Sequence, residues 1–300
     1  MAILPWFARG APGAPFYSWQ SEVDWINEVV LRSRVRGAPT IWGVDQVFIG
    51  AAPWLMRDLA DNASAAEARS LATQLLSNSE GNLNWLAQVD TAALQQLRQR
   101  LNRRRDADYA ALIDAMIVSQ RIYRPFTGGG GETYIANNER EHLMRRLFQE
   151  HYEMAASVDT RPPRVVIKLG ASHAYRGAST TQVQGFGGFV SEFATARGAQ
   201  SLTILMLCPR EGQVAQFVGP ASSCSEDIYA RQWAFIEPYL EPGEITLFDL
   251  RTWRLRPSRW RTLPTEVQRA ILSFDVLVFV APSPAAVLLE GFTPPSQPAG

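Results

Sequence analysis

The chain has 300 residues, of which 46% are hydrophobic and 19% are charged, and its formal net charge is zero. This length and composition are typical of one or two globular domains with a sizeable core. The balanced charge excludes a strong field for nucleic acid, and no apolar run approaches the roughly 18 residues of a membrane helix. We therefore expect a soluble chain without a transmembrane segment and without a nucleic-acid partner.

The compartment stays open at this point. The two cysteines, Cys208 and Cys224, permit one disulfide but do not establish an oxidising environment. The first residues lack the charged-then-apolar order of a signal peptide. A periplasmic or secreted location is expected only if the true start lies upstream. The oligomeric state is also left open.

The N-terminal part predicts the beginning of an α/β core within residues 1–52. Residues 1–17 are rich in proline, which predicts an extended entry segment, and helical spacing of apolar residues predicts a helix over 18–35. Residues 40–44 then predict a short first strand. Asp45 therefore follows a strand end, where it either orients a catalytic group, holds a substrate cation or caps the next segment.

The middle of the chain predicts helices. Residues 53–127 keep helical spacing almost throughout, which indicates an all-helical insertion. Gly128–Gly131 predicts a flexible joint, because no strand precedes it and no phosphate-binding signature follows. Asn138 and Glu141 then predict the cap of a helix that runs to about residue 156.

After Arg161 the pattern alternates between short apolar strands and helices. This alternation predicts an α/β fold with a largely parallel sheet flanked by helices, covering residues 132–290, and a disordered tail over 291–300. The strands are expected at 165–169, 202–207, 245–249 and 276–280, and the helices near 187–197, 226–240 and 264–272.

The run from Val165 to Gly177 is the most informative stretch. A buried-strand pattern stops at Gly170 and is followed by His173, at the strand end where α/β sheets place their chemistry. His173 acts either as a general base or metal ligand, or as a structural loop histidine. Lys168, the only lysine, points either into a pocket or onto an exposed strand flank.

Two further segments contain residues typical of ligand or metal sites, but their spacing does not fit those sites. Gly185–Phe189 contains glycines before a helix, but it lies too far from a strand for a dinucleotide loop, and we expect a tight helix entry. His142 and His151 are nine positions apart on opposite faces of a helix, so they form no zinc pair, and His151 is expected in a core or interface.

Several segments together resemble a known superfamily. Lys168-Leu-Gly170-Ala-Ser-His173-Ala-Tyr-Arg-Gly177, with Gly187–Ala194 and Phe274–Phe279, is similar to the Gly-x-x-His half of the erythromycin-esterase-like, ChaN-like and Tiki/TraB superfamily. Ile41–Gln46 resembles the Gly-x-Asp strand end of its esterase-like branch, and Arg140–Met144 resembles its Arg-x-x-x-Met helix. The likeness covers about residues 15–290, through short motifs.

The resemblance implies a hydrolase that adds water to an ester, lactone or amide. His173 would assist proton transfer, Arg140 would steady the developing negative charge, and Asp45 would belong to the same site, where it could orient His173. Without the resemblance, Arg140 is expected in an ion pair on the helix surface. Lys168, Gly170 and Met144 would contact a small-molecule substrate. No cofactor is fixed by this expectation: the options are none, a divalent metal held by His173, or haem.

The chain departs from this superfamily at its beginning. The families open with a strand that bears a Gly-Glu-x-His motif, and no histidine precedes His142 here. We therefore expect a truncated or misplaced start, or a lineage that has lost half of its site, with impaired catalysis. The alternative function is a non-catalytic haem or small-ligand binding protein of the ChaN-like type, and a remnant with neither function is the third reading.

Overall fold

The computed structural model describes residues 19–32, 40–79, 82, 84–127, 132–209, 211–214, 221–226, 231–281 and 284–288. The predicted entry segment, glycine joint and C-terminal tail lie outside the described residues. Helix accounts for 60% of the described residues and strand for 8%. The protein is therefore largely helical with a small mixed sheet, and the prediction of an α/β fold built on a largely parallel sheet is corrected accordingly. No helix within the described ranges is long and apolar enough to cross a membrane.

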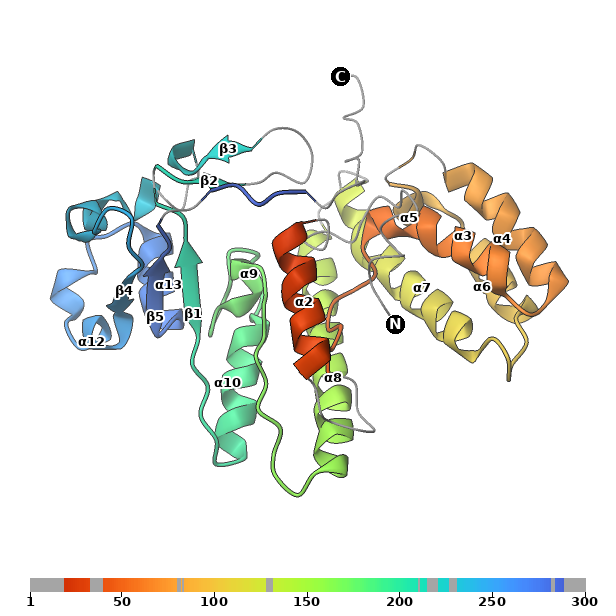
Figure 1. Ribbon diagram of the computed structural model, residues 1–300, viewed down its shortest axis with the longest axis horizontal. Helices are drawn as coiled ribbons and strands as arrows, with labels where there is room; N and C mark the ends of the chain where they lie inside the picture. The colour runs from red at the N-terminus through yellow and green to blue at the C-terminus, as the bar shows by residue number, and fades with distance from the viewer. Residues whose placement is uncertain are drawn as a thin grey trace. The chain divides into compact units, whose positions relative to one another are not determined.

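The chain divides into two compact units, drawn in Figure 1. The first unit comprises residues 1–161 and 288–295, and the second comprises 162–287 and 296–300. The division follows Arg161, whereas the sequence placed residues 132–290 in one core. Each unit is described by itself.

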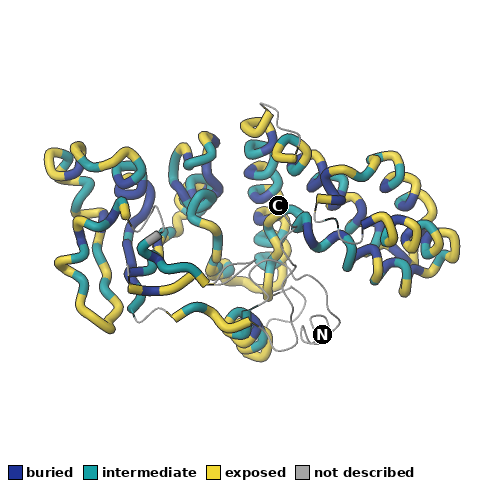
Figure 2. Tube along the Cα trace, turned by 90° about the horizontal axis from the view of Figure 1, so that it is seen from above, coloured by how far each residue is buried: buried dark blue, intermediate teal, exposed yellow. Residues whose placement is uncertain are grey.

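The first unit is built from helices. They are α2 (Gln20–Arg32), the 3₁₀ helix η1 (Ile49–Ala51), α3 (Ala52–Asn62), α4 (Ala66–Ser79), α5 (Trp85–Gln88), α6 (Thr91–Arg100), α7 (Ala107–Thr127) and α8 (Thr133–Val158). Helices α3 to α7 confirm the helical prediction for residues 53–127. Their apolar stripes meet in one core, which Figure 2 shows as buried stretches along the helices. The fully buried side chains of this core include Met56, Leu59, Leu86, Leu94, Leu97, Ile113 and Met116.

The predicted strand at residues 40–44 is wrong. This segment has no regular secondary structure and packs against helices instead: the Trp42 ring lies 5.9 Å from that of Phe148 and is stacked on His151 at 5.7 Å. The Val47 N–H donates to Ser119 Oγ of α7 at 2.8 Å. A large aromatic side chain thus buries its surface on helix α8, so these residues gain their contacts without a strand partner. His151 packs against an aromatic ring, in keeping with its expected structural role.

The start of helix α8 also differs from the prediction. The helix begins at Thr133, so Asn138 and Glu141 lie inside it and do not cap it. Glu141 is 1% exposed. Asn138 and Glu141 have the three-residue spacing of a capping box, but the same spacing also places two side chains on one face of a helix interior.

The second unit combines short helices with two small sheets. Its elements are α9 (Ala171–Ala174), α10 (Phe186–Ala196), β1 (Ile204–Leu207), β2 (Gln213–Val214), β3 (Ser222–Ser223), η2 (Cys224–Glu226), η3 (Ala234–Tyr239), β4 (Thr246–Asp249), α12 (Leu250–Arg254), η4 (Pro257–Arg259), α13 (Thr265–Ser273) and β5 (Val276–Phe279). The predicted strands at 202–207, 245–249 and 276–280 are confirmed within two residues at each end.

The main sheet of this unit is mixed. Its strand order is β1-β5-β4, with β1 parallel to β5 and β4 antiparallel to β5 (Figure 1). The Leu250 N–H donates to the Asp275 carbonyl at 2.9 Å, which joins the end of β4 to the beginning of β5. The chain therefore leaves β4 and enters β5 at the same end of the two strands, so the two strands run antiparallel.

The predicted strand at residues 165–169 is not part of either described sheet. Partly buried and exposed residues alternate along it, as in an extended chain, and Val166 is 87% exposed. The pattern of alternation is therefore present without the pairing. Strand pairing depends on a distant partner, which local spacing does not specify.

One side of the sheet carries the core of the second unit. Leu205, Leu277 and Phe279 pack with Phe274 and with the tryptophans Trp233 and Trp260. On the opposite face Ile204, Met206 and Leu247 are 47%, 66% and 65% exposed. The sheet is thus covered on one face by its own helices.

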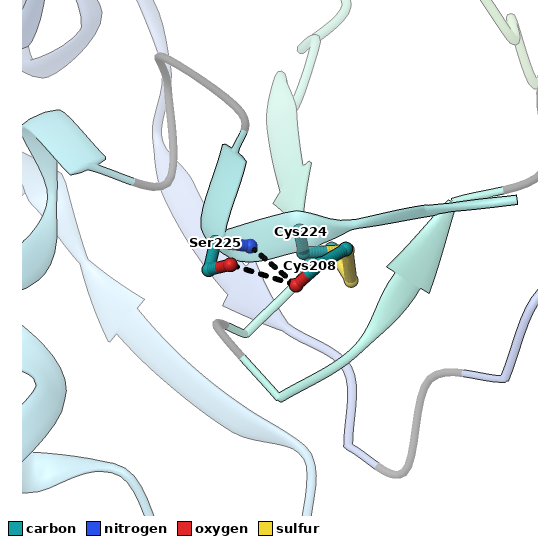
Figure 3. The surroundings of a disulfide bond; sticks show 4 residues. Cys208, Cys224 and Ser225 are labelled. Carbon is teal, nitrogen blue, oxygen red and sulfur yellow. Dashed lines mark hydrogen bonds between the residues drawn. A yellow bond between two sulfur atoms is a disulfide. The ribbon is translucent and has the colours of Figure 1, made fainter.

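A disulfide joins Cys208, just after β1, to Cys224, just after β3 (Figure 3). Cys224 is fully buried. Ser225 next to it is held by Ser223, whose Oγ accepts from the Ser225 N–H at 3.2 Å. The one disulfide that the sequence permits is therefore formed, and it links the end of β1 to the end of β3.

Candidate functional site

His173 lies on the one-turn helix α9, directly after the extended run. Gly170 is the N-terminal cap of this helix, and its carbonyl accepts from the His173 N–H at 3.0 Å. A Cβ placed on Gly170 would lie 4.0 Å from Cδ2 of the His173 ring, so the imidazole lies over Gly170. His173 is partly exposed, and Lys168 is exposed two residues before Gly170.

The glycines that precede helix α10 hold the backbone after His173. The Gly188 N–H donates to the Tyr175 carbonyl at 3.0 Å. A Cβ on Gly187 would lie 2.1 Å from the Ala174 carbonyl oxygen, and one on Gly185 would lie 2.5 Å from that of Tyr175. Such distances exclude any side chain, so glycine is required for this close approach. The expectation of a tight helix entry at Gly185–Phe189 is confirmed.

An ion pair that the sequence did not identify anchors the same loop. Arg176 Nη1 donates to Asp275 Oδ1 at 2.8 Å and Nη2 donates to Oδ2, while Arg254 Nη1 approaches Oδ1 at 3.3 Å. The Thr203 N–H also donates to Asp275, at 3.0 Å. Burial acts to raise the pKa of Asp275, but the hydrogen bonds from Arg176 and Thr203 and the two positive charges outweigh it and lower the pKa. Asp275 therefore stays ionised and ties the loop to the sheet.

Ser172, the neighbour of His173, is engaged elsewhere. Its Oγ is hydrogen-bonded to Thr180 Oγ1 at 2.8 Å. This contact closes the turn that follows α9. It gives Ser172 a structural partner, in agreement with the absence of a serine-nucleophile motif in the sequence.

In the first unit, two predicted catalytic residues form a pair. Arg140 Nε donates to Asp45 Oδ1 at 2.9 Å and Nη2 donates to Oδ2, and the Gln46 N–H donates to Oδ1 at 2.8 Å. Burial acts to lower the pKa of Arg140, but the hydrogen bond and charge of Asp45 raise it overall. Asp45 thus orients Arg140, and Nη1 is the guanidinium nitrogen that Asp45 does not engage.

Tyr123 and Met144 help to define the surroundings of this pair. The pKa of Tyr123 is raised by burial, although a hydrogen bond with Gln46 and the charge of Arg140 act against the shift. On the same helix as Arg140, Met144 is fully buried. The pair therefore lies at the boundary between the helical core and the surface of the first unit, where Arg140 and Asp45 keep side-chain exposures of 29% and 41%.

The predicted site residues thus fall into two sets. Lys168, Gly170 and His173 belong to the second unit, whereas Asp45, Arg140 and Met144 belong to the first. Within the described ranges, no three side chains of histidine, cysteine, aspartate or glutamate are grouped so that they could hold a metal ion. No family model, no curated protein and no solved structure matches the chain.

Proposed function

We propose that the chain is a hydrolase of esters, lactones or amides in which His173 is the general base. The observation that supports this proposal is that His173 is partly exposed, while hydrogen bonds hold the backbone before and after it. A general base must lie within hydrogen-bond reach of the proton that it removes, and its support must keep it there.

The support comes from three independent contacts. The Gly170 carbonyl accepts from the His173 N–H, and the Gly188 N–H donates to the Tyr175 carbonyl two residues after His173. Arg176, one residue further on, is paired with the buried Asp275. His173 combines this restraint with partial exposure of the residue. The restraint therefore favours a role for the imidazole itself.

In the proposed reaction, neutral His173 removes a proton from water as the water oxygen forms a bond to the substrate carbonyl carbon. The tetrahedral intermediate then collapses, the bond to the leaving alcohol or amine breaks, and the imidazolium returns the proton to that leaving group. The imidazole ends the cycle unchanged. This proposal does not depend on Arg140, whose expected role in binding negative charge stays a separate prediction.

The test is hydrolysis of a panel of aryl esters, aliphatic lactones and anilides by the full chain. General-base assistance is typically worth about 10²- to 10⁴-fold, so His173→Ala should lower kcat/KM for the best substrate by a factor in that range. His142→Ala is the matched control, because His142 is exposed on helix α8, and it should leave the rate unchanged. Circular dichroism establishes that both variants fold.

Haem titration separates this function from the ligand-binding alternative. The hydrolase proposal predicts no stoichiometric Soret band. A stoichiometric band that is lost in His173→Ala, together with no hydrolysis of any substrate in the panel, would contradict the proposal and favour haem binding.

A further inference from the structure

The neutral total charge conceals a local concentration of arginine in the second unit. Residues 249–261 contain five arginines and one aspartate, a net charge of +4 within 13 residues. This segment comprises the end of β4, helix α12, helix η4 and the turn that follows it. Such clustering creates a local positive field that the balanced composition does not reveal.

The backbone of this segment is well supported. The Arg256 N–H donates to the Trp253 carbonyl at 2.8 Å, and the Arg261 N–H donates to the Pro257 carbonyl at 3.0 Å. The indole of Trp260, which is 7% exposed, donates to the Trp253 carbonyl at 2.8 Å. The buried side chain of Trp260 therefore holds the backbone of the turn in place.

The arginines of the segment divide into two groups. Arg251 is paired with Asp249, and Arg254 is bound to Asp275 and to the Ile271 carbonyl. The remaining three, Arg256, Arg259 and Arg261, are exposed and have no ion-pair partner among the described residues. We name residues 255–261 the basic turn.

The acidic residues that flank the segment in the sequence form no ion pair with the basic turn among the described residues. Glu266 is paired with Arg269. Glu241 and Glu244 precede β4, at the end of that strand opposite to α12, which separates them from α12 by the length of the strand, roughly 13 Å at about 3.3 Å per residue. The basic turn thus carries three exposed arginines whose charges no acidic side chain of the described residues pairs.

A protruding apolar residue accompanies these charges. Leu255 is 83% exposed, directly before Arg256. Surfaces for single-stranded nucleic acid combine arginine with exposed aromatic faces, but the aromatic side chain of the basic turn, Trp260, is buried. Cations beside an exposed leucine are instead the combination that binds at a bilayer interface, where arginine contacts lipid phosphate and the apolar side chain enters the headgroup layer.

We propose that the basic turn docks the protein reversibly on an anionic phospholipid surface. Arg256, Arg259 and Arg261 contact lipid phosphates, and Leu255 enters the interface. The inference is independent of the proposed hydrolase function, because it concerns a surface and not the imidazole of His173.

The test is co-sedimentation of the full chain with vesicles of phosphatidylcholine alone and of phosphatidylcholine mixed with phosphatidylglycerol. The protein should sediment with the mixed vesicles at low salt and be released by high salt. Replacing the three arginines (Arg256→Glu, Arg259→Glu, Arg261→Glu) should weaken partitioning by at least roughly 100-fold, and Leu255→Ser should weaken it by a smaller factor.

Arg103, Arg104 and Arg105 provide the matched control. They form an exposed arginine turn in the first unit, and it is preceded by the buried Leu101 and followed by the buried Asp106. Their replacement by glutamate makes the same change in total charge and should leave vesicle binding within a few-fold of wild type.

Four outcomes would overturn the proposal. They are no binding to the mixed vesicles, equal binding to neutral vesicles, equal loss in the two triple variants, and unchanged binding in both Leu255→Ser and the basic-turn variant. A fluorescence-polarisation assay with a duplex oligonucleotide runs in parallel. Binding of the oligonucleotide that is lost in the basic-turn variant, without vesicle binding, would identify a nucleic-acid surface instead.

Discussion

At the scale of single residues, the ion pair of Arg176 with Asp275 connects the loop after His173 to the sheet. Asp275 has a side-chain exposure of 6%, and it accepts from two arginines and a backbone N–H. Loss of one partner from a buried ion pair leaves an uncompensated charge, which is costly in the interior. The exposed pair Arg251–Asp249, in the same unit, provides a comparison.

Asp275→Asn is predicted to lower the free energy of unfolding of the second unit by about 3–5 kcal/mol, because Arg176 and Arg254 lose their carboxylate. Asp249→Asn should cost much less than Asp275→Asn, since Asp249 is exposed and asparagine also caps a helix. Urea denaturation followed by circular dichroism measures both. Equal losses in the two variants would show that burial of Asp275 does not decide its contribution.

The same carboxylate should make the free energy of unfolding sensitive to acid. The pKa of Asp275 in the folded chain lies below its ordinary value of 3.8, because bonds from Arg176 and Thr203 outweigh burial. A group with a lowered folded pKa stabilises the fold above its unfolded pKa, and the stability is lost as the pH falls through the folded pKa. Unfolding free energy should therefore decline below pH 3.8.

Asp275→Asn should make this decline shallower. Part of it should remain, because the hydrogen bonds of Asp106 with Ser64 and Asn102 outweigh burial and lower its pKa in the first unit as well. Urea titrations at a series of acidic pH values test the effect. A decline of unchanged slope in the variant would assign the acid sensitivity to other groups.

At the scale of elements, the entry of helix α10 determines where the backbone around His173 lies. Gly187→Ala should destabilise the second unit by about 1–3 kcal/mol, because its Cβ would lie 2.1 Å from the Ala174 carbonyl oxygen and the loop must move. If His173 is the general base, the variant should also lose hydrolysis. Thermal unfolding and kcat/KM are the measurements.

Gly177→Ala is the control for this substitution. Nothing lies within 4 Å of a Cβ at Gly177, and its backbone is not in the left-handed region. Alanine there should be neutral or stabilise by up to about 1 kcal/mol through the unfolded chain. A loss at Gly177 as large as that at Gly187 would mean that close packing is not the cause.

The elements also show what local sequence can predict. Helices α3 to α7 and strands β1, β4 and β5 follow from apolar spacing and breakers, because each buries a face that its own residues define. Residues 40–44 and 165–169 have the same apolar character but are not paired strands. Pairing and direction depend on contacts such as Leu250 with Asp275, which lie far apart in the sequence.

The candidate site shows a similar division. The glycines of Gly185–Phe189 signalled a tight helix entry, and it is present. The partnership of Arg176 with Asp275 gave no local signal, because 99 positions separate the two residues. The pairing of Arg140 with Asp45 joins two residues that were each singled out, but their spacing did not reveal that they bind each other.

At the scale of the whole molecule, the two units have separate hydrophobic cores, one around Leu59 and Met116 and one around Trp233 and Phe274. The disulfide between Cys208 and Cys224 belongs to the second unit. Its effect on stability should therefore be confined to that unit.

Replacement of both cysteines by serine should lower the unfolding free energy of the second unit by about 3 kcal/mol, as expected for a closed loop of about 15 residues. Differential scanning calorimetry should show two transitions, of which one moves to lower temperature and the other stays. A dithiol reductant should have the same effect on the wild-type chain. A single transition that shifts as a whole would contradict independent unfolding of the two units.

In the proposed hydrolysis, the imidazole of His173 removes the proton from water. The most direct measurement is chemical rescue of His173→Ala by added imidazole, followed with the best substrate of the panel and with identical additions to wild type and to His142→Ala. If His173 is the general base, added imidazole should restore a saturable part of the lost rate in His173→Ala and leave the rates of wild type and His142→Ala unchanged. Full activity in His173→Ala without imidazole, or a loss that no concentration of imidazole restores in a folded variant, would contradict it.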